Sequence, residues 1–355
     1  MQIAVTSCIY CLQAFRGGNR MSLITRTFLL MMCWMACQSS VLADIYRVTT
    51  DVEGRGSQER SAGLARAFNE VLVRASGKAE VVANATVRKA NPQSYIETFG
   101  YTTSQESGEP LLEVVFNQAQ VEGLLGRAGF AVWGINRPSV MMWVGVEDGG
   151  RQLVTASDLG DLAIFRYALV RRGVPAVWPL GDLQDEMALP MSRLFGLFRQ
   201  DAREASARYP SSALLTAKVE RYGNRWQLDG FLEHRGDSRT LSLKASEPSE
   251  MAALLADWLA EYFSGRYGVS THASGAGVQA VQVSGMSSFG EYQEVLKLLK
   301  SANGVQSVSV AGMSDDVLTV QLGLRASWSQ VRANLRLDPR LVPSASDSVF
   351  EWRAR

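Results

Sequence analysis

The chain has 355 residues, with 36 basic and 35 acidic side chains and a net charge of +1 at neutral pH. This balance leaves no basic stripe for phosphate backbones, so nucleic acid is excluded as an expected partner. The length is typical of two or three domains. All four cysteines, Cys8, Cys11, Cys33 and Cys37, lie within the first 37 residues of the chain.

Residues 1–43 have the pattern of an export signal. The apolar run Phe28–Cys37 spans about ten residues, half of what a membrane-spanning helix requires, and matches the hydrophobic region of a signal peptide. Val41-Leu42-Ala43 then provides suitable residues at positions −3 and −1 of a cleavage site. We predict cleavage between Ala43 and Asp44, a periplasmic location and no stable transmembrane anchor.

The alternative is a lipid-anchored envelope lipoprotein that is cleaved before Cys37. Ala36 fits such a site, but Trp34 stands where the lipoprotein peptidase favours a small aliphatic residue such as leucine. The first twenty residues resemble neither a signal-peptide start nor a domain. We interpret Met21 as the true initiator, so that the signal peptide spans residues 21–43.

The apolar periodicity of the remaining chain predicts an α+β (mixed α/β) protein with three units. Residues 44–137 form a small α+β unit, with strands near 45–52, 95–101 and 111–116 and two helices, one of which Asn117 caps. Residues 138–269 alternate strand and helix, continue with three strands and end in a helix over 250–263. That order predicts a mixed sheet in which a parallel crossover precedes an antiparallel meander.

A linker of small residues at 270–277 precedes the third unit, residues 278–355. Its elements follow the order βαββαβ, which is that of a ferredoxin-like domain. Strand alternation predicts one sheet face under the helices, with Val281, Val283, Val308, Val310, Leu318 and Val320. The opposite face would carry Gln282, Ser284, Ser307, Ser309, Thr319 and Gln321. A polar, unreactive face of this kind indicates docking rather than catalysis.

Few residues suggest chemistry. His234 and His272 are predicted to be exposed loop residues without a nearby nucleophile. The acidic residues Asp182, Asp185 and Glu186 lack the calcium-loop pattern and are interpreted as a solvated turn before a helix. No cysteine remains after residue 37 to bind a soft metal. We therefore expect no catalytic residue, no metal site and no cofactor, and we interpret the scattered tryptophans as core residues.

Several ordered stretches resemble a known family. They are "RSAGLARAFNEVLVRASGK", "LLEVVFNQAQVEGLLGRAGFAVWGINRPSVMMWVGVED", "RRGVPAVWPLGDLQD" and "EASARYPSSALLTAKVERYGNRWQLDGFL". Together they resemble domain of unknown function 2066, a family of exported, uncharacterised proteins of Gram-negative bacteria, over roughly 45–265. The resemblance implies a signal peptide and an envelope location, and it implies no activity.

Two functions are compatible with these features. The first is a non-catalytic periplasmic module that binds an unidentified envelope protein through its sheets and exposed edges. The alternative is a periplasmic hydrolase that uses two carboxylates on an envelope glycan. Because the sequence offers no carboxylate pair in an apolar setting, it favours the binding module.

Overall fold

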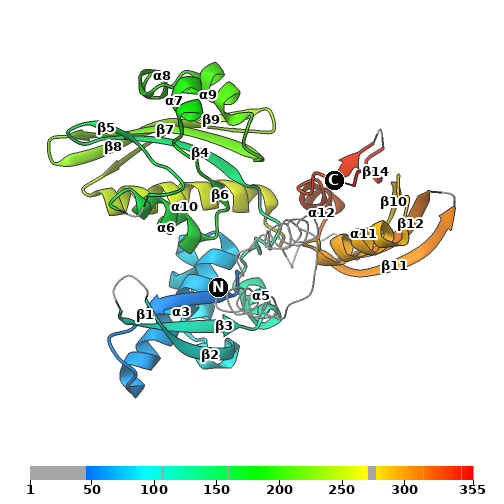
Figure 1. Cartoon of the computed structure of the whole chain (residues 1–355). Helices are drawn as coiled ribbons and strands as arrows, with labels where there is room; N and C mark the ends of the chain where they lie inside the picture. The colour runs from blue at the N-terminus through cyan, green and yellow to red at the C-terminus, as the bar shows by residue number, and fades with distance from the viewer. Residues whose placement is uncertain are drawn as a thin grey trace, which may run out of the picture. The chain divides into compact units, whose positions relative to one another are not determined.

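The computed structural model describes residues 45–104, 108–158, 160–270, 277–314, 316–344 and 346–354. These residues form an α+β protein with three β-sheets (Figure 1), which confirms the predicted fold class. Residues 45–355 constitute one compact unit. The predicted signal peptide, with Met21, Cys37, Ala43 and Asp44, lies outside the described residues, as does His272. None of the described helices has both the length and the hydropathy that crossing a membrane requires.

The first sheet is antiparallel, with the order β1-β3-β2. Its strands are β1 (Arg47–Asp51), β2 (Ile96–Thr103) and β3 (Pro110–Phe116). Helices α3 (Ser57–Ser76) and α5 (Gln118–Arg127) bury their apolar residues against one face, where Leu72, Val114 and Leu125 are fully buried. Short turns of helix, η2 (Ala79–Ala83), α4 (Ala85–Arg88) and η3 (Pro92–Tyr95), connect α3 to β2. Asn117 caps α5 as predicted, by accepting a hydrogen bond from the Gln120 amide.

The second sheet has the order β5-β4-β7-β8-β9, with β6 beside β4. Its strands are β4 (Val140–Glu147), β5 (Arg151–Leu153), β6 (Ala176–Val177), β7 (Ala213–Tyr222), β8 (Arg225–His234) and β9 (Asp237–Ala245). β4 pairs in parallel with β7, and β7, β8 and β9 form an antiparallel meander, as predicted.

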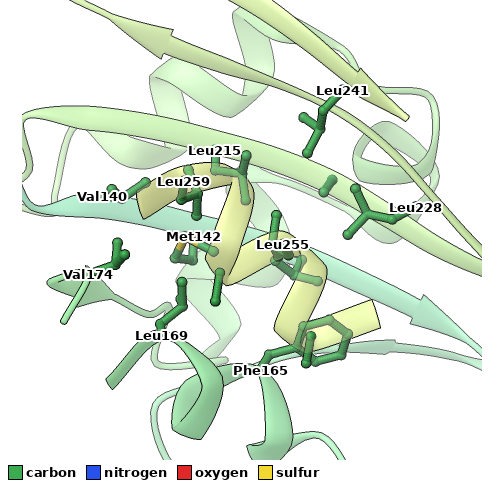
Figure 2. Close-up of a cluster of buried hydrophobic side chains, with 14 of the residues drawn as sticks. Val140, Met142, Phe165, Leu169, Val174, Leu215, Leu228, Leu241, Leu255 and Leu259 are labelled. Carbon is green, nitrogen blue, oxygen red and sulfur yellow. The ribbon is translucent and has the colours of Figure 1, made fainter. Parts of the chain in front are cut away.

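Helices cover both faces of this second sheet. Because side chains alternate along β4, Met142 and Val144 face α6 (Ala163–Arg172) and α10 (Pro248–Tyr267), as Figure 2 shows for Met142. Met141 and Trp143 face the opposite side, under α7 (Leu183–Ala188), α8 (Met191–Phe195) and α9 (Arg199–Ser206). A strand buried on both faces explains why β4 is apolar at nearly every position.

The third sheet has the order β11-β12-β10-β14-β13. Its elements are β10 (Val278–Ser284), α11 (Phe289–Ser301), β11 (Val305–Ser314), β12 (Val317–Leu324), α12 (Trp328–Leu335), β13 (Leu341–Pro343) and β14 (Val349–Trp352). The order matches the predicted one up to α12. Beyond α12 the chain forms a hairpin of two short strands, in place of the single strand predicted. The chain reverses its direction between β13 and β14, which pair antiparallel. As a result, β14 runs parallel to β10.

The two faces of the third sheet differ as the strand pattern predicts. Val281, Val283, Leu318 and Val320 are fully buried, whereas Gln282, Ser309 and Gln321 are exposed. β11 departs from the pattern, since Val308 is half-buried and Val310 is 46% exposed. The reason is positional: β11 is the outermost strand (Figure 1), and nothing among the described residues covers its far side.

Candidate functional site

His234 is buried rather than exposed, so the interpretation of this residue as a loop bystander is wrong. It ends β8, and only 1% of it is exposed. Its Nε2 lies 3.0 Å from the Tyr267 hydroxyl and its Nδ1 lies 3.3 Å from the Tyr262 hydroxyl. The Phe263 ring packs edge-on against the imidazole. Helix α10 supplies all three aromatic neighbours, a contact that local sequence around His234 does not reveal.

The His234 environment favours a neutral imidazole. Desolvation lowers its pKa from 6.5 to about 4, and the positive charges of Arg235 and Arg266 act in the same direction. Burial also raises the pKa values of Tyr262 and Tyr267, so all three groups are uncharged at neutral pH. Each ring nitrogen already has a phenol partner. The cluster therefore holds α10 to the end of β8, and it has the features of a structural contact.

The acidic turn before α7 is also more ordered than predicted. Asp185 is fully buried, and its carboxylate accepts hydrogen bonds from the Tyr209 hydroxyl at 2.7 Å and the Gly181 amide at 3.0 Å. The Arg208 guanidinium donates a hydrogen bond to the Asp185 carboxylate at 3.0 Å. It also donates to both carboxylate oxygens of Asp182, at 2.8 and 2.9 Å. Arg208 lowers the pKa of Asp182 by stabilising the carboxylate.

This network contradicts the interpretation of a solvated turn for Asp185, whereas Asp182 is half-buried and Glu186 is exposed. Asp182 is the N-cap of α7, and Asp185 joins that helix to the end of α9. The oxygens that a cation would need are already occupied by Arg208 and Tyr209. Within the described ranges, no three His, Cys, Asp or Glu side chains are placed to share a metal ion.

Arg137 joins helices α3 and α6, which pack on the first and second sheets, and was not identified from the sequence. Its guanidinium stacks on the Trp133 ring at 3.8 Å and donates to four backbone carbonyls, including those of Arg74 and Gly173 at 2.8 Å each. These two carbonyls belong to the C-terminal turns of α3 and α6, where a cation complements the helix dipole. Burial lowers the pKa of Arg137 to about 9, so the group stays charged at neutral pH.

Carboxylates gather where β4 and β7 end, around an open depression of about 430 Å³. Glu147 and Glu220 are register partners across the parallel pair, and Asp148 follows Glu147. Each of these acids has a cationic partner: Arg151 at 3.3 Å, Lys218 at 2.7 Å and Arg221 at 3.3 Å, respectively. The general acid of a glycoside hydrolase instead needs a desolvated carboxyl group that retains its proton.

A second depression of about 590 Å³ shares Asp148 with the first, and the residues that line it include Phe165 and Trp226. Asp148, Asp158 and Asp161 also line this depression. Asp148 is paired with Arg221, and the Asp158 carboxylate accepts a hydrogen bond from the Thr155 amide at 2.5 Å. Two of the three acids are thus engaged locally, which favours a structural role for them over proton transfer.

The most unusual surface of the molecule is the edge strand β11. Its ten residues, VQSVSVAGMS, contain neither a charge nor a proline, and it pairs only with β12. The other edges in the described sheets are protected: β6 has two residues, β13 ends in Pro343, and β1, β2, β5 and β9 each contain a charged residue. Short length, charge and proline are the features that prevent an edge from pairing with another chain. Two irregularities of register, at 305/307 and 310/312, are the only such feature in β11.

Helix α11 adds an apolar border to this edge. The Glu294–Arg340 ion pair, 2.9 Å long, holds one flank of α11 towards the β13 side of the sheet. Tyr292 and Leu296 lie about 160° around the helix from Glu294, on the flank towards β11. Because a three-residue turn reverses the chain between α11 and β11, the helix and the strand run in opposite directions along this edge.

Six apolar residues of α11 and β11 that are at least partly exposed make up what we call the β11–α11 strip: Phe289, Tyr292, Leu296, Val308, Val310 and Met313. Phe289 is 75% exposed, Met313 52% and Val310 46%, and the other three are half-buried. The Phe289 and Tyr292 rings stack at 5.8 Å, which orders the exposed end of the strip. An ordered apolar strip beside unpaired backbone groups is typical of a surface that accepts an added strand.

Sequence reasoning predicted docking by this part of the chain but assigned it to the polar sheet face. The feature of the sequence that distinguishes β11 from the other edge strands is the absence of charge over ten residues. The position of β11 at the edge depends on the order of strands in the sheet, which cannot be read from the sequence.

Comparison with known proteins corrects the family resemblance. Residues 40–134 match the model of a family described as "Domain of unknown function (DUF8605)". The resemblance to domain of unknown function 2066 is therefore wrong, because the matching family is a different one, and its match ends before β4 begins at Val140. The stretches that suggested it include α3 and β3, whose amphipathic spacing many α+β layers share.

None of the curated proteins matches the chain. One solved structure, described as "Crystal structure of uncharacterized protein", is 17% identical, with a TM-score of 0.16. That alignment covers 37% of this chain and 89% of the other.

Proposed function

We propose that this protein is a non-catalytic, periplasmic module of the cell envelope that binds another envelope component at the β11–α11 strip. The observation that carries the proposal is β11 itself, a ten-residue edge strand without charge or proline. Its outward amide and carbonyl groups can extend the sheet by one strand, and the strip supplies apolar contacts for alternate side chains of that strand.

The groups that most resemble catalytic residues support this proposal indirectly. His234 is neutral and bonded to two phenols, and Asp185 is bonded to Arg208 and Tyr209. A catalytic acid or base instead needs access to a substrate and a free proton position. The hydrolase alternative would depend on the acids at the ends of β4 and β7, Glu147, Asp148 and Glu220, each of which has a cationic partner.

Site-specific photocrosslinking in intact cells tests the proposal. A photoreactive residue at Ser309 on β11 is expected to give a discrete protein adduct. The same residue at Gln282, which is exposed on the same sheet face but belongs to the interior strand β10, is the matched control. Val310→Lys in the Ser309 background should abolish the adduct, because it places a charge on the strip. Equal labelling at both positions, or none, would refute the β11 site.

A further inference from the structure

We infer that the depression lined by Phe165 and Trp226 is a binding site for a small organic cation, in which an ammonium or amidinium group is joined to an apolar body. The site belongs to the second sheet and the β11–α11 strip to the third, so the inference goes beyond the proposed function. It follows from the position of the depression in its sheet, from the residues that line it and from the charges around it.

The depression lies at the carboxyl ends of parallel strands. β4 has parallel neighbours on both edges, β6 on one and β7 on the other. The chain passes from β4 to β6 through α6, which packs on one face of the sheet, and from β6 to β7 through α8 and α9, which pack on the opposite face. Connections that leave on opposite faces create a crevice beyond the carboxyl ends of the strands, where open α/β sheets bind their ligands. Val146 of β4 and its register partner Val219 of β7 line the depression, so it occupies this crevice.

The lining provides space for an apolar body. The depression holds about 590 Å³, within the range of about 300–1,000 Å³ that is typical of small-molecule sites. Phe165 of α6, drawn in Figure 2, and Trp226 of β8 line it together with the half-buried Leu162 and Ile164. Gly150 also lines it, and a Cβ atom at this position would meet no heavy atom within 4 Å. The depression can therefore accommodate an aromatic ring system.

The charged part of the lining is acidic. The carboxylates of Asp148, Asp158 and Asp161 line the depression, and no lysine or arginine among the described residues does so. Arg221 pairs with Asp148 at 3.3 Å, and Arg166 donates to the backbone carbonyl of Asp158 rather than to its carboxylate. Asp161 is exposed and forms no ion pair within the part of the chain that the structure describes. A cationic ligand would form a charge-assisted hydrogen bond with this carboxylate.

Two helix ends beside the depression act in the opposite direction. α6 and α10 both begin here, and the amino-terminal end of a helix carries about half a positive charge. Asp161 comes two residues before α6, and Glu250 lies in the first turn of α10, so each end already has a carboxylate beside it. An anionic ligand would be repelled by these carboxylates and by Asp158. The charges around the depression therefore favour a cation.

Three indole compounds of matched shape test the inference. Tryptamine carries an ammonium group, whereas tryptophol and indolepropionate carry a hydroxyl and a carboxylate in the same position. In ligand-observed NMR titrations at neutral pH, we expect tryptamine to bind and the other two to bind at least about tenfold more weakly, because only the ammonium can pair with Asp161. The absence of tryptamine binding at millimolar concentration, or equal affinity for all three compounds, would overturn the inference.

Two pairs of variants locate the bound tryptamine. Asp161→Asn keeps the shape of the side chain and removes its charge, so the dissociation constant should rise about tenfold. Its control, Glu186→Gln, removes an exposed acid from α7 on the opposite face of the same sheet and should leave the constant unchanged. Gly150→Leu fills the open space and should abolish binding, whereas Gly265→Leu, at an equally open position on α10, should not.

The four substituted positions are exposed, so the thermal melts of all four variants should match that of the wild type. Wild-type affinity for tryptamine in Asp161→Asn or in Gly150→Leu would overturn the inference. Equal weakening by a variant and its control would overturn it as well, because the effect would then not depend on the depression.

Discussion

The buried imidazole of His234 should make the stability of the protein depend on pH. Its pKa is about 4 in the folded protein, against 6.5 for an exposed histidine. Between these values the unfolded chain binds a proton that the folded chain does not, so stability is full above about pH 6.5 and is lost as the pH falls towards 4. At 1.36 kcal/mol per pKa unit, this depression corresponds to about 3 kcal/mol.

The substitution His234→Gln removes the titration and keeps a side chain that can donate to and accept from Tyr262 and Tyr267. At pH 7.5 we expect the variant to be less stable by about 1–2 kcal/mol, because its hydrogen bonds to the two phenols are less well placed. As the pH falls, the wild type loses the histidine contribution and the variant does not. At pH 4 the variant should therefore equal or exceed the wild type in stability.

Urea unfolding at a series of pH values between 7.5 and 4 measures this effect. The relevant quantity is the difference in unfolding free energy between wild type and variant, because titration of the carboxylates and of His272 is common to both chains. Two parallel profiles across the series would refute the reasoning. They would mean that water reaches the imidazole, or that the charge of Asp237, which raises the pKa of His234, outweighs the effect of burial.

Three further results are expected. Asp185→Asn should lower the free energy of unfolding by about 3 kcal/mol, because Arg208 and Tyr209 lose the buried carboxylate that they contact. The control is Glu186→Gln at an exposed neighbouring position, which should change the free energy of unfolding by less than about 0.5 kcal/mol in the same urea assay. Arg137→Lys should cost about 2–3 kcal/mol, since an ammonium cannot serve four carbonyls and stack on Trp133; an unchanged melting temperature would contradict this. The intact mass of protein from the envelope fraction should correspond to a chain that begins at Asp44, and a diacylglyceryl-modified Cys37 terminus would contradict cleavage after Ala43.

The sequence by itself determined the fold class and most elements of the described chain. Apolar periodicity predicted α3, α10 and α11, because burying one face of a helix requires residues three and four positions apart. The alternation of strand and helix after residue 138 predicted the parallel crossover, and the hairpin turns that follow predicted the meander. The end of the chain was less predictable: β13 has only three residues, too few for an alternation to be recognised.

Only the tertiary structure decided the environment of the polar residues and the position of the open edge. His234 precedes a hairpin turn, yet α10, which begins fourteen residues later, surrounds it with aromatic rings. Asp185 sits in an acidic stretch, yet Arg208 and Tyr209 from beyond α9 bury it. β11 resembles its neighbour β12 in composition and differs from it in having no partner on one side. Burial and strand order arise from contacts between residues distant along the chain, and a local pattern contains no information about them.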